Sequence, residues 1–260
     1  MIKDLLLPRE KFADIRSLYG LSPFTFEIEN EEQVLFYFGA NHSKDSANPQ
    51  YVMLREYWKR FLSVTENRER IVLVEGGSRH VEKDEETAIR RGCEAGFITL
   101  LASRENVVAT SPDLSLEELA EKFPDISKEE VLLLRFIDRA DSFQRNKSQE
   151  LFEDIIEAWF KDLRRLDMWK DIETTLPNLK EIYKKVIGRD FDLQESMNNL
   201  ANPNRTGTRI NEISSVLTDA RDVNIVSVIE GYWKEGMSVF AVFGSGHLVI
   251  QRPALEKLLV

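Results

Sequence analysis

The run Val34-Leu35-Phe36-Tyr37-Phe38 leads directly into Gly39-Ala40-Asn41-His42, and the same order returns as Val239-Phe240-Ala241-Val242-Phe243 followed by Gly244-Ser245-Gly246-His247. Each copy joins five apolar residues of strand character to a Gly-x-x-His motif. The chain has only three histidines, so this pattern holds two of them. Glycine permits a tight turn after a buried strand, and α/β sheets bind ligands at the carboxyl ends of their parallel strands. We therefore expect His42 and His247 to face one pocket.

A third apolar run, residues 70–74, ends in Glu75 and is followed by Arg79. It has the continuous hydrophobic character of a strand buried on both faces. A helix beginning near Pro49 separates it from the first Gly-x-x-His segment, and this strand-helix-strand order favours parallel pairing. Glu75 then ends a strand at the same sheet edge as the two histidines.

The remaining patterns predict an α/β fold with a small, mostly parallel central sheet flanked by helices and a large helical insertion before the last core strand. Residues 24–28 alternate like a strand that forms a hairpin with the first core strand, and residues 106–110 predict another short strand. Ser127 and Glu130 form a capping box that opens a helix. We expect an N-terminal α/β half over 1–126, a helical insertion over 127–220, and a C-terminal half over 221–260 that completes the core.

The amino-acid composition limits the classes of function that this protein can have. The net charge of −10, from 35 basic and 45 acidic residues, disfavours a nucleic-acid partner. No apolar stretch is long enough to span a bilayer, and the first residues lack a secretory signal, so we expect a cytoplasmic protein without a membrane partner. The single Cys93 excludes an intramolecular disulfide and a cysteine-based zinc cluster, and a metal would need His, Asp or Glu ligands.

His42, Glu75 and His247 support two chemistries. Two imidazoles and one carboxylate can bind a divalent metal, such as Mn, Co or Zn, and leave positions open for water and substrate. Without a metal, one histidine can deprotonate water while Glu75 orients it. The simpler alternatives are structural: a histidine at a strand end is often only hydrogen-bonded, and a carboxylate after four apolar residues must reach solvent, a metal or a cation such as Arg79.

Four more residues are candidates for the same pocket. Arg221 lies in a predicted helix before the last strand, where an arginine is ordinarily on the surface, and we expect it to join Arg79 as a catalytic residue. Asn41, Glu94 and Arg205 are candidate substrate-binding residues. Glu94 lies in helical sequence between Gly92 and Gly96 and lines the pocket or is exposed, whereas Arg205 lies in a turn-rich loop that is a lid or a solvated connection.

These residues resemble the superfamily that includes erythromycin esterase, the ChaN haem-binding protein, TraB and the Tiki proteases. The resemblance rests on the two Gly-x-x-His motifs, on Glu75 followed by Arg79, and on Arg221-Asp222 before the last strand. It covers about the first hundred residues and the last forty. It implies an α/β fold of two related halves with a pocket between them, lined by the histidines, the glutamate and the arginines.

The resemblance implies several activities. Esterase-like members use histidine and glutamate on a water molecule, Tiki-like members are metal-dependent peptidases, and ChaN-like members bind haem. We expect a hydrolase of an ester, lactone or amide bond, acting on a small-molecule or peptide substrate with an anionic group. The alternatives are non-enzymatic binding of haem or another anionic small molecule, and an interaction protein that works through its helical insertion. Oligomeric state does not follow from the sequence.

Overall fold

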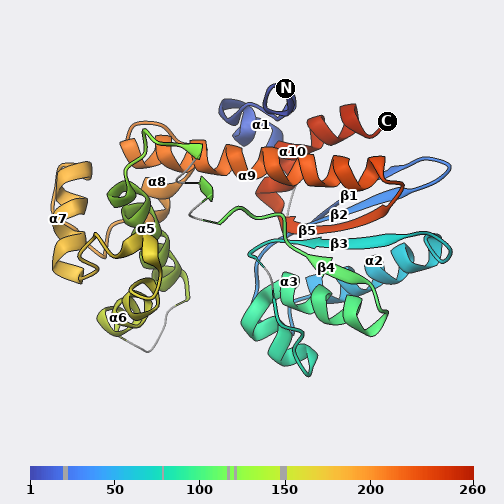
Figure 1. Ribbon diagram of the computed structural model, residues 1–260, viewed down its shortest axis with the longest axis horizontal. Coiled ribbons are helices and arrows are strands. Elements are labelled where there is room, and N and C mark those ends of the chain that lie inside the picture. Colours follow the sequence, from blue (N-terminus) through green and yellow to red (C-terminus); the bar gives the residue numbers. More distant parts are fainter. Residues whose placement is uncertain (20–22, 78, 116–117, 120–121, 147–150) are drawn as a thin grey trace. The chain divides into compact units, whose positions relative to one another are not determined.

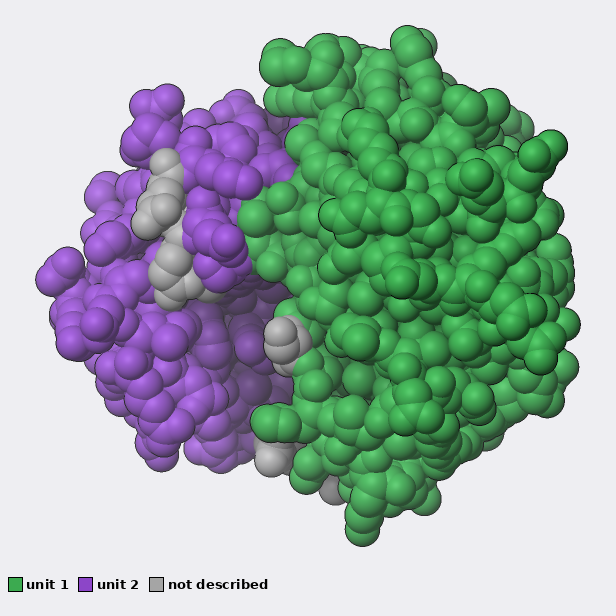
Figure 2. All heavy atoms as spheres, turned by 45° about the vertical axis from the view of Figure 1, so that its right-hand side comes forward, with its two compact units in different colours: residues 1–114, 221–260 green, residues 115–220 purple. Residues whose placement is uncertain are grey.

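The computed structural model describes residues 1–19, 23–77, 79–115, 118–119, 122–146 and 151–260. The chain folds into two compact units. Unit 1 comprises Met1–Leu114 and Arg221–Val260, and unit 2 comprises Ser115–Ala220, as coloured in Figure 2. The expected α/β core with a helical insertion before the last strand is therefore present. The insertion begins at Ser115 in this division, twelve residues before the expected boundary at 127, because the chain leaves the core soon after its fourth strand.

Unit 1 is built on a five-stranded sheet in the order β1-β2-β5-β3-β4. The strands are β1 (Phe24–Glu29), β2 (Val34–Ala40), β3 (Arg70–Val74), β4 (Val108–Thr110) and β5 (Ser238–Gly244). Only β1 is antiparallel, as half of the expected hairpin with β2. The last strand, β5, lies between β2 and β3 and is parallel to both. Because β5 lies at the centre of the sheet, the two strands that lead into the Gly-x-x-His motifs are side by side.

Helices cover both faces of this sheet (Figure 1). One face packs against α2 (Gln50–Val64) and α3 (Glu85–Arg104), through side chains such as Phe36, Phe240 and Trp58. The other face packs against α10 (Ser245–Leu258) and the unit 1 part of α9 (Arg209–Lys234). Every residue of β2 and β5 is buried, which explains why these strands are continuously apolar rather than alternating.

Helix α3 contains a break at Cys93. Cys93 has φ 49° and ψ −141°, values that do not belong to a helix. Gly96 lies so close to the carbonyl oxygen of Ala88 that a side chain there would collide with it. The break turns the second half of α3 so that Glu94, at its start, is 1 % exposed.

Unit 2 contains helices and no strand among its described residues. Its elements are α5 (Lys128–Asn146), α6 (Phe152–Leu163), η3 (Asp167–Trp169), α7 (Leu176–Ile187), α8 (Met197–Ala201) and the first part of α9. The predicted capping box opens α5: the Ser127 hydroxyl accepts the Glu130 N–H at 3.2 Å, and the Glu130 carboxylate accepts the Ser127 N–H at 2.8 Å. Phe136, Phe152 and Phe191 pack together in this unit.

The N-terminal segment of unit 1 forms two short 3-10 helices, η1 (Ile2–Leu5) and η2 (Arg9–Lys11), and α1 (Phe12–Leu18). It packs on α10 through contacts such as the bond from the Leu7 N–H to the carbonyl of Ile250. No helix within the described residues is long and apolar enough to cross a membrane.

Candidate active site

Glu75 is the centre of a cluster at the carboxyl edge of the three middle strands. It follows β3 directly, beside the end of β5, where its N–H donates to the carbonyl of Val242 at 3.2 Å. Carboxylate oxygen Oε2 accepts the Gly244 N–H at 2.8 Å and lies 3.4 Å from Nε2 of His42. Oxygen Oε1 accepts a hydrogen bond from Arg221 at 3.2 Å and lies 3.5 Å from Nε2 of His247. The three expected residues therefore meet, with one histidine at each oxygen of Glu75.

His42 lies in the loop that follows β2. Its φ of 27° is rare for a residue other than glycine, and such conformations persist only where surrounding contacts enforce them. Nδ1 of His42 lies 3.3 Å from the Glu94 carboxylate. That carboxylate also accepts the Ser43 N–H at 2.8 Å and the side-chain amide of Gln50 at 2.7 Å. Glu94 thus fixes both the loop and the imidazole, while 53 % of the His42 side chain stays exposed.

His247 occupies a different local structure. The chain passes from β5 directly into α10, which begins at Ser245 and places His247 in its first turn. Nδ1 of His247 lies 2.6 Å from the Asp222 carboxylate. Asp222 is fully buried and also accepts hydrogen bonds from Gln251 at 2.7 Å and Arg9 at 2.9 Å. His247 is 12 % exposed, so it is the inner and His42 the outer histidine of the cluster.

Each histidine therefore pairs with a carboxylate through Nδ1 and presents Nε2 to Glu75. A carboxylate at Nδ1 selects the tautomer, orients the ring and stabilises its protonated form. The Nε2 distances of 3.4 and 3.5 Å exceed an ordinary hydrogen bond of about 2.7–3.2 Å, so both Nε2 atoms remain available to an incoming group.

The charges in the cluster perturb each other strongly. The Glu75 carboxylate beside Nε2, together with Glu94 at Nδ1, raises the pKa of His42 to about 10. Burial lowers the pKa of His247, but the charges of Asp222 and Glu75 outweigh burial and raise it to about 9. Burial would raise the pKa of Glu75, yet its histidine neighbours bring it well below its usual range. At neutral pH the cluster therefore holds two imidazolium ions around a carboxylate.

Arg221 and Asp113 hold this arrangement from the α9 side. Arg221 is not a surface arginine: it donates to Glu75 and, through Nε and Nη2, to Asp113 at 3.1 and 3.0 Å. Asp113 lies in the loop after β4 and also accepts the Gly76 N–H. The side-chain amide of Asn224, one turn along α9 from Arg221, donates to the carbonyl of Pro112 at 2.6 Å. These bonds tie the turn after β3 to the helix before β5.

Three other candidates have partners away from the Glu75 carboxylate. Arg79 does not bind the Glu75 carboxylate: its Nη2 donates to the Glu75 backbone carbonyl at 2.9 Å, because the Gly76-Gly77 turn folds back over the strand end. Asn41 is exposed, and its N–H donates to the side chain of Gln50. Arg205 is exposed and lies in unit 2, where its N–H donates to the carbonyl of Asn202.

Sequence reasoning missed Asp222, Asp113 and Arg9 as site residues. Asp222 had a detectable signal, because it adjoins Arg221 in a helix that leads to β5 and lies 25 residues before His247. Arg9 and Asp113 come from segments without periodic pattern, at sequence distances of 213 and 108 residues from the partners they bind. Such pairings follow from the fold and have no local signature.

His42, Glu75 and His247 are the candidate metal ligands. Within the described part of the chain, no three His, Cys, Asp or Glu side chains are grouped so as to hold a metal ion. Here Nδ1 of each histidine faces a carboxylate and Nε2 faces Glu75. As arranged, His42, Glu75 and His247 do not fit the expected divalent metal.

Comparisons with protein-family models, with curated proteins and with solved structures gave no match to this chain.

Proposed function

We propose that the chain is a hydrolase of an ester, lactone or amide bond, and that the reaction takes place at His42, Glu75 and His247. The observation that carries the proposal is the convergence of two carboxylate–histidine pairs on one glutamate. Ion pairs that only stabilise a fold do not need two oriented imidazoles with free Nε2 atoms. Buried, strongly coupled titratable groups of this kind are characteristic of sites that move protons.

The two histidines differ in their exposure to solvent, and this difference suggests separate catalytic roles. His42 is half exposed, so it can meet water and substrate, and in its neutral form it removes a proton from the attacking water. The hydroxide so formed bonds to the carbonyl carbon, and the carbonyl oxygen takes the negative charge. Protonated His247 and Arg221 can stabilise that oxyanion, since both are cationic N–H donors within the cluster.

Collapse of the tetrahedral intermediate breaks the bond to the alcohol or amine. The proton that His42 took from water passes to this leaving group, and the products are a carboxylic acid and an alcohol or amine. Glu75 keeps the two imidazoles in place and balances their charge. Each step uses residues of this chain alone.

The test is a panel of small esters, lactones and peptides, followed by product formation. The wild type should turn over at least one class, and His42→Gln and His247→Gln should each lower the rate by about 100-fold or more, the usual share of a general acid or base. Circular dichroism checks that the variants fold. Equal rates in the wild type and both variants would refute the proposal.

A second function, non-enzymatic binding of haem or another anionic small molecule, is favoured by one observation. Raised histidine pKa values keep both imidazoles protonated at neutral pH, so each can donate its Nε2–H to an anionic group. Protein purified from its own host would then carry a ligand and show no hydrolysis across the panel. Measurable hydrolysis by protein without a ligand supports the enzyme instead.

A further inference from the structure

Arg79 differs from the arginines around it. Among the described residues it forms no ion pair with a carboxylate, whereas Arg9, Arg91 and Arg221 each bind one. Its one hydrogen bond runs from Nη2 to the backbone carbonyl of Glu75, and its Nε is buried without a hydrogen-bond partner. A buried donor without a partner costs free energy, so this cation is held in place by the shape around it.

Two glycines provide that shape. Gly76 has φ +92°, and a side chain there would collide with Nη2 of Arg79. Gly92, on α3, is buried, and a Cβ atom there would lie 3.1 Å from Nη1 of Arg79. Glycines from two separate elements thus leave the space that the guanidinium occupies.

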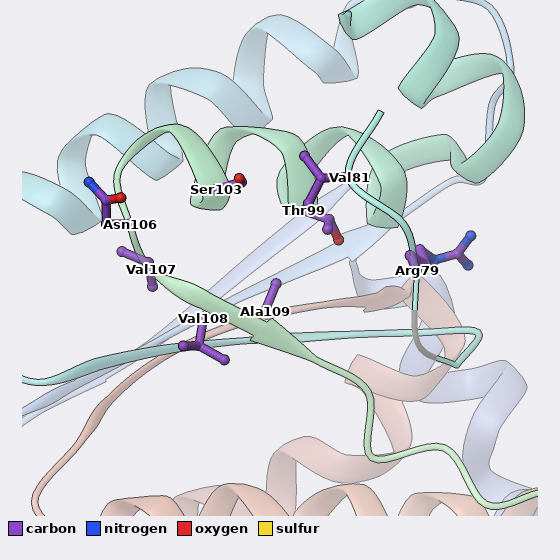
Figure 3. Close-up of a pocket in the computed structure, with 8 residues that line it drawn as sticks. All are labelled: Arg79, Val81, Thr99, Ser103, Asn106, Val107, Val108 and Ala109. Atoms are coloured by element: carbon purple, nitrogen blue, oxygen red, sulfur yellow. The ribbon is translucent and has the colours of Figure 1, made fainter. Parts of the chain in front are cut away.

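Arg79 lines two hollows of unit 1. The larger, of about 350 Å³, lies between β4 and α3 and is lined by Thr99 and Ser103 among others; Figure 3 shows the guanidinium pointing away from these residues. The smaller, of about 190 Å³, is lined by Arg79, Arg91, Gly92 and Gly96. The guanidinium lies against Gly92, which lines the smaller hollow. The positive charge of Arg79 is therefore located at the smaller hollow.

The charge of the smaller hollow is positive. Its single carboxylate, Glu82, is bound to Arg91 at 3.1 Å, which leaves Arg79 unneutralised by its described surroundings. A guanidinium with free N–H groups matches the two oxygens of a carboxylate or phosphate. We propose that this hollow binds the carboxylate or phosphate group of a small molecule through Arg79. As a substrate subsite it rests on the hydrolase proposal, whereas binding is measured without turnover.

The experiment is calorimetric titration of the whole chain with inorganic phosphate and, separately, with acetate at constant ionic strength. We expect saturable binding of at least one anion, and the two titrations show which group is preferred. Arg79→Gln should weaken binding by roughly tenfold or more, the usual loss for a charge-assisted hydrogen bond. Arg79→Lys should also weaken binding, because lysine keeps the positive charge but lacks the planar pair of N–H donors that a guanidinium offers to two oxygens.

The matched control is Arg90→Gln. Arg90 is an exposed neighbour of Arg91 on α3 and is absent from the lining of the hollow, so the same loss of charge there should leave binding unchanged. Gly92→Ala provides a variant that retains Arg79 but crowds its guanidinium, and it should lower the affinity. Absence of saturable binding by the wild type, or equal affinity in Arg79→Gln and the wild type, would overturn the site. Either result leaves the hydrolysis panel unaffected.

Discussion

Replacing Asp222 with asparagine tests how the inner histidine is held. The substitution keeps the size of the side chain and removes the charge that His247 and Arg9 both face. Arg9 is 12 % exposed and Asp222 is 0 % exposed, so the loss leaves a nearly buried guanidinium without this partner. Breaking a buried ion pair from one side costs about 3–5 kcal/mol of stability.

Part of that cost depends on pH in a definite direction. His247 has a folded-state pKa of about 9 against an ordinary value of 6.5. At roughly 1.36 kcal/mol per pH unit, this difference corresponds to about 3 kcal/mol of stability. Because the folded-state pKa is the higher one, the stabilisation is fully present below pH 6.5 and is lost as the pH rises through 9. Asp222→Asn lowers the pKa of His247, so it should destabilise the fold more at pH 6 than at pH 10.

Urea unfolding of the wild type and Asp222→Asn at pH 6 and pH 10 measures this difference, which should reach about 3 kcal/mol if the pKa returns fully to its ordinary value. Glu230→Gln is the control, since it removes a carboxylate from the same helix that pairs with the exposed Lys234. It should change stability by about 0.5 kcal/mol or less at both pH values. A destabilisation by Asp222→Asn that is equal at pH 6 and pH 10 would show that Asp222 does not raise the pKa of His247.

Three further predictions concern the break in α3 and the outer histidine. Gly96→Ala should destabilise the fold by about 1–3 kcal/mol because its Cβ would collide with the carbonyl oxygen of Ala88. Gly231→Ala is the control: it lies in open space on α9 and should be neutral or stabilising. Urea unfolding compares the two variants, and equal effects would contradict the close contact between Gly96 and Ala88. Glu94→Gln should lower the pKa of His42, so the rise of hydrolysis with pH should begin at a lower pH, while loss of the carboxylate that orients the imidazole should reduce the maximal rate about tenfold or more; an unchanged pH profile and maximal rate with the best substrate would argue against a role for Glu94. Hydrolysis by the wild type should rise between pH 7 and pH 9 because the neutral form of His42 increases, and a rate already constant above pH 7 would exclude His42 as the base.

Much of the core of unit 1 could be predicted from the pattern of apolar residues. The apolar runs before Gly39, Glu75 and Gly244 are buried strands, and the strand-end rule placed His42, Glu75 and His247 at one edge because the three strands are parallel neighbours. Periodicity does not specify which strands are adjacent. The position of β5 between β2 and β3 depends on long-range packing, and it is what brings the two histidines to one carboxylate.

The partners of the site residues were less predictable. Glu75 and Arg79 are four residues apart and of opposite charge, which favoured a direct ion pair, but the positive φ of Gly76 and Gly77 turns Arg79 to the backbone instead. Glu94 is buried because of the break at Cys93, which a regular helical pattern does not anticipate. The two Gly-x-x-His segments also differ in structure, since a loop follows Ala40 whereas a helix starts at Ser245.

His42 and His247 share Glu75 in the structure, and an NMR titration of the imidazole nitrogens tests this sharing in solution. The chain has only three histidines, so their signals can be assigned by single replacements. We predict that His42 and His247 lose a proton near pH 10 and pH 9, and that Glu75→Gln lowers both pKa values together. If both histidines titrate near the ordinary value of 6.5 in the wild type, and Glu75→Gln changes neither, the cluster does not exist in solution.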